Sequence, residues 1–580
     1  MSEAQPQVGL EFLSRIEQEE AAICRLLAED SLGLGMLTAI KEFDFYFYNL
    51  VRNAESETTQ EHFYLMRLGL PRMLEKLLSN VPRFRVPVVT FRSDDLMISA
   101  ALGMVARFGF MEHGRRMCQA SLAGECTLHK INETLFEFRL PKVLHNYEAI
   151  EAYIDAHYQQ QMKEVRDELI DNLLSKDGLA NHLENCFRDN VYAFHKKFIG
   201  YAAHPDLDEF FFGQAYSDLL NRGTVEVFHF DLLFGGLKYL HYTVCLAYLL
   251  SIAMKHERFC KALIEMHPEI RLRDILTVTA EKEGFVADMM SAMNHYGTRF
   301  EGYFPINISQ AQQLYTVFSV GRGNLRLLQN SMMNAPCLVE YSEAAVVKTI
   351  SGTQLDAGEF LLEALRLHYP AEYDTNQQTR ERSMQDALER ILSGSFPVAK
   401  FRKNLRLRLN GHILTDVDFI ALDESEGTVL FFQLKYQDHY RGDFRKRSSR
   451  GVRLREETEA WFRATKKWLA EAGRMQIQTA LRLKKHIRVE RVLMIAIGKK
   501  FAHFLAPLAS NDDFAYSSWT QFYDSVVRVA SELSSPDLVA LFAVCRLQMT
   551  HAVSTPLQID EETVFHLDTL NFQIVQKQDQ

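Results

Sequence analysis

The sequence has few cysteines, few tryptophans and no hydrophobic run of membrane length. Eight cysteines and three tryptophans are spread over 580 residues. A chain of this length buries a large core without disulfide staples, so we expect reduced thiols in a cytoplasmic protein, not a disulfide-rich secreted one. The most apolar stretch, Tyr239–Met254, contains His241 and is shorter than the ~20 residues that span a bilayer. We expect a buried core helix there, and no membrane association.

Several motifs are also missing. No phosphate-binding loop of the form G-x-x-x-x-G-K-[ST] occurs, so the sequence indicates no nucleotide cofactor. No internal repeat or low-complexity linker is present. The first twenty residues do not combine a basic segment with an apolar run, so we expect no secretory signal.

What is present is typical of a globular protein. The composition is 47% hydrophobic, 24% charged and 11% aromatic, which excludes a disordered or collagen-like chain. Domains usually contain ~100–200 residues, so a chain of 580 residues is expected to form two to four of them.

The charge is distributed unevenly along the chain. The formal net charge is −10, yet residues 400–500 carry 24 Lys and Arg against 12 Asp and Glu. This balance of +12 lies within a chain whose other residues carry 41 basic and 63 acidic side chains. A basic block in an acidic protein indicates a local anionic partner, and the acidic remainder would direct that partner to one approach.

Residues 1–340 predict an α-rich region, with a possible division near residue 145. Leucines recur at helical spacing between Leu65 and Leu78. A small patch follows, with a strand at Val86–Phe91, a helix capped by Asp94, and a hairpin at Thr127–Leu140 turning at Asn132-Glu133. A winged-helix-like element is one interpretation of this patch. Packing on the surrounding helices is favoured, because no recognition-helix chemistry is visible.

Residues 341–580 predict a region that contains strands as well as helices. Two helices are expected at 356–369 and 379–393, separated by Pro370–Gln378. Turn signals then separate three strands and are followed by a polar helix and a further apolar strand. The expected strands are Phe401–Leu409, Ile413–Leu422, Val429–Lys435 and Arg491–Ile497, and the helix is 456–485. This order predicts an α/β domain with a central mixed sheet flanked by helices.

Two of these strands carry charged residues at alternate positions. The period of two in a strand places Asp416 and Asp418 on one face, and Gln433 and Lys435 on one face of the next strand. Charged groups in a half-buried strand need compensation, which an Asp–Lys ion pair or a divalent cation would supply. The sequence alone leaves both interpretations open.

The segments TDVDFI and FQLK, with a turn containing Gly427 between them, resemble the PD-(D/E)xK nuclease superfamily, whose fold is restriction-endonuclease-like. Gln433 stands where an acid is usual, so the resemblance is to the QxK branch, which includes Mrr-like enzymes. It implies a catalytic core at about 379–500. It also implies Mg²⁺ (or Mn²⁺) held by Asp418 and Gln433, with Asp416 as an accessory ligand.

The resemblance further implies that Lys435 orients water or stabilises charge. A glutamate of the preceding helix would complete the site. Glu381 is the first candidate and Glu389 the second.

The basic block is expected to contact phosphates. Part of it alternates with leucines on a strand, and the rest follows the Gln433–Lys435 strand in a Gly- and Ser-containing segment that we expect to be a mobile loop. The residues are Arg402, Lys403, Arg406, Arg408, Arg441, Arg445, Lys446, Arg447, Arg450, Arg453 and Arg455.

Together these features predict a Mg²⁺-dependent nuclease acting on DNA. An RNase on the same fold, and a nucleic-acid-binding or scaffolding protein with an inactive nuclease-like domain, are the alternatives. The α-rich region is expected to regulate, recognise or form homo-oligomers. By analogy with restriction and phage-defence proteins, a protein or a phage-derived molecule would activate it.

Overall fold

The structure is a computed structural model. It describes residues 4–27, 33–52, 57–80, 91–124, 126–140, 168, 170–171, 174–175, 178–221, 227–330, 335–355, 357–377, 379–438, 444–484, 486–533, 536–551 and 563–576. The predicted strand at Val86–Phe91 lies almost entirely outside these residues.

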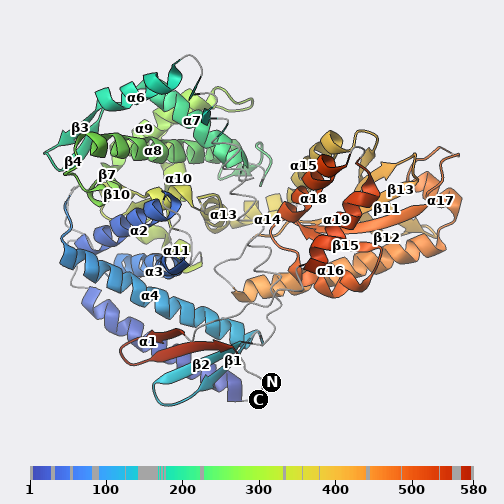
Figure 1. The fold of residues 1–580 in the computed structure, drawn as a ribbon, viewed down its shortest axis with the longest axis horizontal. Coiled ribbons are helices and arrows are strands. Elements are labelled where there is room, and N and C mark those ends of the chain that lie inside the picture. Colours follow the sequence, from blue (N-terminus) through green and yellow to red (C-terminus); the bar gives the residue numbers. More distant parts are fainter. Residues whose placement is uncertain are drawn as a thin grey trace.

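The described residues form two hydrophobic cores. Figure 1 shows the two corresponding parts of the ribbon side by side. The first extends from Phe12 to Tyr373 and includes residues 565–572, and we call the part of the chain around it the large body. The second extends from Met384 to Met549, and we call this part the sheet domain. Buried residues up to Tyr373 thus belong to the first core, as does a segment near the C-terminus.

The large body is mainly helical, as the sequence predicts. Its helices are α1 (Ala4–Leu27), α2 (Leu34–Arg52), α3 (Glu57–Asn80), α4 (Asp95–Leu122), α6 (Leu179–Asn190), α7 (Pro205–Asn221), α8 (Tyr239–Met266), α9 (Lys282–Gly297), α10 (Ile308–Phe318), α11 (Arg326–Asn330), α12 (Ile350–Gln354), α13 (Ala357–His368) and α14 (Pro370–Gln377), with short 3₁₀ turns at Leu272–Asp274 and Arg322–Asn324.

Short strands decorate these helices. They are β1 (Thr127–Lys130), β2 (Leu135–Leu140), β3 (Val191–Phe194), β4 (Phe198–Tyr201), β5 (Leu233–Phe234), β6 (Leu237–Lys238), β7 (Val278–Glu281), β8 (Ser319–Val320), β9 (Leu338–Glu340), β10 (Ala345–Lys348), β16 (Thr563–His566) and β17 (Asn571–Gln576). The order β7-β10-β9-β8 forms one sheet and β1-β2-β17-β16 another.

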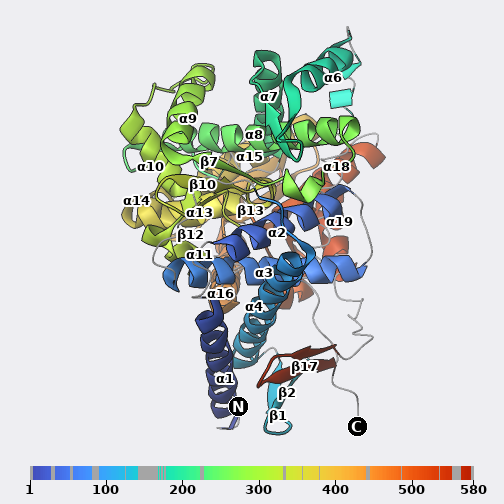
Figure 2. The ribbon, with the colours of Figure 1, turned by 90° about the vertical axis from the view of Figure 1, so that its left-hand side faces the viewer.

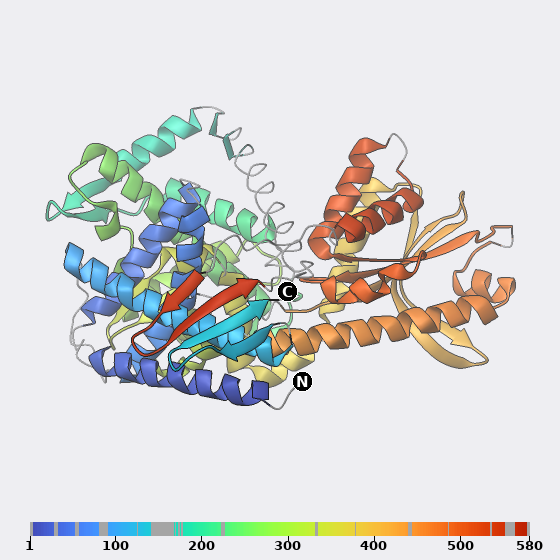
Figure 3. The same cartoon turned by 60° about the horizontal axis from the view of Figure 1, so that its bottom comes forward.

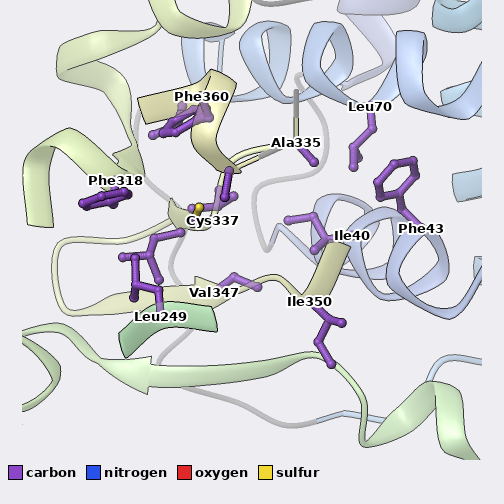
Figure 4. Packing of buried hydrophobic residues seen from close by; sticks show 14 of the residues in the cluster. Ile40, Phe43, Leu70, Leu249, Phe318, Ala335, Cys337, Val347, Ile350 and Phe360 are labelled. Carbon is purple, nitrogen blue, oxygen red and sulfur yellow. The ribbon is translucent and has the colours of Figure 1, made fainter. Parts of the chain in front are cut away.

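Local sequence explains several of these elements. The apolar run from Tyr239 becomes α8, whose first fifteen residues are nearly all buried, so the predicted core helix is confirmed. Asp94 caps α4 by accepting a hydrogen bond from the backbone N–H of Met97. Figure 4 shows the core around α2 and the β8–β10 sheet, where Ile40 and Phe43 lie near Val347 and Ile350. No helix in the described ranges is both long and apolar enough to cross a membrane.

The predicted hairpin at 127–140 is confirmed, but it has an unexpected partner. β1 and β2 pair antiparallel, and β17 pairs in parallel with β2. The ring of Phe572 in β17 lies 5.7 Å from that of Phe12 in α1. Figures 2 and 3 show this sheet beside α1 and α4. The winged-helix interpretation gains no support, because the ribbon packs on helices of its own body.

The sheet domain contains α15 (Arg380–Ser395), β11 (Lys400–Leu409), β12 (His412–Asp423), β13 (Thr428–Lys435), α16 (Phe444–Glu471), α17 (Arg474–Ala480), β14 (Arg491–Gly498), a 3₁₀ segment (His503–Ser510), β15 (Phe514–Ser518), α18 (Trp519–Glu532) and α19 (Leu538–His551). The strand order is β11-β12-β13-β14-β15. The first three strands are antiparallel and the last three parallel, so the sheet is mixed, as predicted.

Helices cover both faces of this sheet (Figure 3). On one face, the rings of Phe419, Phe432 and Phe522 of α18 pack in sequence. On the other face lies α16, where the Trp461 and Trp468 indoles donate hydrogen bonds to backbone oxygens of β12 and β11. Coverage on both sides explains why every residue from Thr428 to Leu434 is buried.

Two local predictions are wrong. Pro370–Gln378 was expected to be a break, but Pro370 begins α14, since the first position of a helix needs no backbone N–H donor. The basic segment after β13 was expected to be a mobile loop, but from Phe444 onward it is the first part of α16. Gly451 of this helix makes a tertiary contact with the ring of Phe504. The contact is so close that a Cβ atom on residue 451 would lie 2.4 Å from the ring.

Candidate functional site

The side chains of Asp418 in β12 and Gln433 in β13 are hydrogen-bonded to each other. The Gln433 side-chain amide Nε2 donates a hydrogen bond of 2.6 Å to Asp418 Oδ2. The backbone N–H of Leu434 donates a second one, of 2.7 Å, to the same oxygen. Asp418 is 6% exposed and Gln433 5%. The pair is therefore a buried polar contact on the α16 face of the sheet.

The position of this pair follows from the strand register. The antiparallel ladder between β12 and β13 ends at Phe419↔Phe432. One residue further along, the Asp418 carboxylate replaces a backbone acceptor and takes the N–H of Leu434. Beyond the end of the backbone ladder, β12 and β13 are thus joined through the Asp418 side chain, next to Gln433 and Lys435.

Lys435 lies where three elements meet. Its Nζ is 3.2 Å from Glu457 Oε2 of α16. The carboxyl groups of Glu381 on α15 and Asp418 on β12 also act electrostatically on it. Burial alone would lower the pKa of Lys435, but these carboxylates outweigh it, and its pKa lies above the ordinary value. Lys435 is therefore a fixed positive charge at neutral pH.

Burial raises the pKa of Asp418 to about 7. The N–H of Leu434 and the Lys435 ammonium lower it, whereas the Glu381 and Asp416 carboxyls push it further up. Burial, together with the charges of Asp416 and Glu457, also raises the pKa of Glu381, although Lys435 opposes them. Burial therefore disfavours the ionised forms of Asp418 and Glu381. Burial acts in the same direction on Glu457, but the hydrogen bond from Arg453 and the Lys435 charge outweigh it and lower the pKa of Glu457.

A pocket of about 530 Å³ opens beside these residues. Its wall contains Asp374 and Gln377 of α14, Glu381 of α15, Lys435, Tyr436 and Gln437 after β13, and Arg450, Arg453, Leu454 and Glu457 of α16. Asp418 and Gln433 are buried and are not part of this wall, but the charges of Glu381 and Lys435 act on Asp418. The pocket lies at the junction of the large body and the sheet domain, because α14 packs on the first core and α16 on the second.

Of the two glutamates considered for the preceding helix, the structure places Glu381 in this pocket. Glu389 instead lies 2.5 Å from Lys403 Nζ, two helical turns further along. Asp416 is exposed, and its cross-strand partner in β11 is Arg406. Sequence reasoning missed Glu457, which is one of several glutamates in a polar helix and carries no local signal of its role.

The predicted phosphate-binding residues of β11 divide into two kinds. Arg406 and Arg408 are exposed and alternate with the buried Leu407 and Leu409, as expected. Lys403 is held by the carboxylates of Asp386 and Glu389. Arg402 donates a hydrogen bond to the backbone oxygen of Arg482. The exposed arginines are therefore better placed for an external anion.

The predicted residues after β13 also separate. Arg441 and the side chain of Arg445 lie outside what the structure describes. Arg450 and Arg453 line the pocket, and Arg453 Nε donates to Glu457 Oε1.

The remaining members of this group lie elsewhere. The guanidinium of Arg447 is 5.4 Å from the centre of the Phe501 ring. Lys446 is exposed and acts electrostatically on Glu363, and Arg455 is half-buried.

The described side chains do not form a ready-made metal cage. No group of three His, Cys, Asp or Glu in the ranges given above is arranged to hold a metal ion. Mg²⁺ commonly uses one or two carboxylates and completes its shell with water and substrate phosphates. Asp418, the Gln433 carbonyl oxygen and Glu381 are oxygen ligands of this type, in addition to Glu457, which is paired with Lys435. The raised pKa values of Asp418 and Glu381 indicate that a nearby cation would stabilise their ionised forms.

Comparisons with known proteins identify no relative. No protein-family model, no curated protein and no solved structure matches the chain.

Proposed function

We propose that this chain is a Mg²⁺-dependent nuclease that hydrolyses phosphodiester bonds, with DNA as its substrate. One observation carries the proposal: Asp418 and Gln433 are paired on adjacent strands, and Lys435 and Glu381, whose charges act on Asp418, line one pocket. The order around these residues is one helix, three strands, the long helix α16, the short helix α17 and one strand, and apart from α17 it agrees with the resemblance to PD-(D/E)xK nucleases.

The residues present fit the chemistry of a metal-assisted hydrolase. Asp418, Gln433 and Glu381 would hold the ion, with Asp416 as the accessory ligand expected from the sequence. When bound, Mg²⁺ supplies charge neutralisation at the phosphate and lowers the pKa of water. Two carboxyls with raised pKa values beside one lysine make a site that favours a divalent cation.

The protein's own groups have separable tasks. Lys435 stays protonated, so it acts as a cation that stabilises charge developing on the phosphate and not as a base. Glu457 holds the lysine Nζ at 3.2 Å and so fixes its direction. Arg450, exposed at the pocket wall, provides an attractive charge for the incoming phosphate backbone.

One observation favours the alternative of a non-cleaving nucleic-acid-binding protein. Gln433 donates its amide N–H to Asp418, which already accepts from Leu434, so that carboxylate oxygen is fully engaged inside the protein. A decayed site that keeps the fold for binding would show the same contact.

The test uses the full-length protein with supercoiled plasmid, single-stranded DNA and RNA, in Mg²⁺, Mn²⁺ or EDTA. We expect cleavage of DNA that needs the metal and is abolished by Asp418→Asn and by Lys435→Met. Glu426→Gln is the matched control, since this exposed residue lies at the other end of the same two strands. Cleavage of RNA alone would make the chain an RNase. Binding without cleavage of any substrate would support the inactive alternative, and cleavage that persists in both variants would refute this site.

A further inference from the structure

A buried arginine joins the large body to the sheet domain next to the candidate site. Arg380, the first residue of α15, is fully buried. Its Nη1 donates a hydrogen bond of 2.6 Å to Asp438 Oδ1, and its Nη2 donates to the Tyr373 hydroxyl. Arg366 of α13 donates to the second Asp438 oxygen. One carboxylate thus receives two arginines from different helices.

Three aromatic rings surround the Arg380 guanidinium. Its Cζ lies 4.2 Å from the centre of the Phe228 ring and 4.9 Å from those of Tyr373 and Tyr436. The rings come from separate segments: Phe228 precedes β5, Tyr373 is in α14 and Tyr436 follows β13. Phe228 and Tyr373 belong to the core of the large body, and Tyr436 packs against that core. The cage therefore spans the junction of the two parts.

A charged group is a costly way to hold two bodies together. Removing an ion pair from water costs much of what its attraction returns, and apolar residues of similar volume often stabilise as well or better. Burying a guanidinium between three rings and a carboxylate does, however, specify one geometry, because its planar fork fits only certain directions. The arrangement is consistent with a requirement for alignment and not only for adhesion.

The residues aligned by the cage are the neighbours of the candidate catalytic residues. Arg380 directly precedes Glu381, and Tyr436 directly follows Lys435. Asp438 lies three residues after Lys435. The Arg380–Asp438 ion pair therefore connects the start of α15 to the segment that directly follows β13, next to Glu381 and Lys435, which line one pocket.

We propose that Arg380 and Asp438 are positioning residues that set the separation of Glu381 and Lys435, and that contacts from Phe228 and Tyr373 make this separation depend on the large body. The inference rests on the nuclease function proposed above. It adds a role for the large body, which supplies two of the three rings of the cage and so helps to hold Glu381 and Lys435 at a fixed separation.

The first experiment measures cleavage by full-length Arg380→Met, Arg380→Lys and Asp438→Asn. A displacement of about 1 Å at a reacting centre costs up to about 100-fold in rate, so we expect kcat to fall about tenfold or more in Arg380→Met. KM for the nucleic acid should change less than about threefold, because the exposed arginines that bind it are untouched. Arg382→Met is the matched control, since Arg382 is exposed on the same turn of α15.

The second experiment does not depend on cleavage. Hydrogen exchange of backbone amides is compared in segments 381–385 and 434–438. Arg380→Met, and Phe228→Leu in the large body, should accelerate exchange in both segments together, whereas Arg382→Met should not. If Arg380→Met does not fold, Arg380→Lys and Phe228→Leu decide the question.

The two proposals fail in different ways. If the wild type cleaves nothing, the nuclease function fails, and the exchange experiment still tests the joint. If Asp418→Asn abolishes cleavage but Arg380→Met leaves kcat unchanged, the nuclease stands and the positioning role is refuted. Faster exchange in only one of the two segments would also refute it.

Discussion

Gln433 donates its amide hydrogen to Asp418 over 2.6 Å, in the place where the resemblance implies two metal ligands. Without a bound cation, Gln433 is the hydrogen-bond donor and Asp418 is the acceptor. Binding of a metal through the Gln433 carbonyl oxygen would require the amide to turn, because its N–H₂ and not its oxygen faces the carboxylate. The orientation of the Gln433 amide toward Asp418 thus distinguishes a metal site from a structural polar pair.

Gln433→Glu provides a test of this distinction. We expect the variant to lose about 1–3 kcal/mol of stability at pH 8 without metal, because a second carboxylate replaces the donor to Asp418. Mg²⁺ should restore this loss, since two carboxylates attract the ion more strongly than one. Thermal unfolding titrated with MgCl₂ measures both effects. Gln433→Leu is the control, which loses the same donor but should gain nothing from Mg²⁺; equal Mg²⁺ responses in the two variants would contradict the prediction.

Asp418 gives the protein an unusual pH dependence. Its pKa of about 7 in the folded protein lies above the ordinary 3.8, so the folded state binds this proton more tightly than the unfolded state. Its contribution to stability therefore falls as pH rises from about 4 to about 7, by on the order of 2–4 kcal/mol. Asp418→Asn lacks this term, so its unfolding temperature relative to wild type should rise across that interval. Glu426→Gln should show no such trend, and a constant difference between Asp418→Asn and wild type would count against the assignment.

The exposed arginines should govern the salt dependence of nucleic-acid binding. Each phosphate contact contributes about 0.7–0.9 to the slope of log K against log salt. Arg450→Gln and Arg406→Gln should each make the slope shallower by about this amount. Lys403→Gln should not, because the Asp386 and Glu389 carboxylates already neutralise that lysine. Fluorescence anisotropy at several salt concentrations provides the slopes. A similar change of slope in all three variants would contradict the prediction that Arg450 and Arg406 contact phosphates and Lys403 does not.

Phe572 should be important for the large body although it lies far along the chain. It is fully buried and packs against the rings of Phe12, Phe138 and Phe565. Phe572→Ala should destabilise the large body by about 3–5 kcal/mol. Chemical unfolding followed separately in each part by hydrogen exchange checks this, with Val564→Ala as a control because Val564 is 37% exposed. Equal losses in the sheet domain would contradict the division into two cores.

The local elements of the sheet domain could be predicted because its signals are short-range. Asn410-Gly411 lies between β11 and β12, and Gly427 has a positive φ of 62° just before β13, so turn chemistry fixed the strand ends. Alternation placed Asp416 with Asp418 on one face of β12, and Gln433 with Lys435 on one face of β13.

The errors arose where tertiary contacts decide the structure. The segment after Phe444 carries enough positive charge to suggest a loop. It is instead part of helix α16, in which Leu454, Trp461 and Phe462 are buried in the core of the sheet domain. The pairing of β17 with β2 joins segments more than 400 residues apart, and no local pattern encodes it. Arg380 stands among charged and polar neighbours, and nothing in this local sequence indicates an aromatic cage, whose rings come from distant segments.

The return of β16 and β17 to the large body makes the sheet domain an insertion within it. A ribosome completes the whole sheet domain before it synthesises the strands that finish the sheet of β1 and β2. The β1-β2-β17-β16 sheet of the large body therefore cannot be completed while the domain carrying the candidate site is still being made. For the same reason, a single proteolytic cut at either junction leaves the sheet domain covalently attached to the large body, so its release needs two cuts.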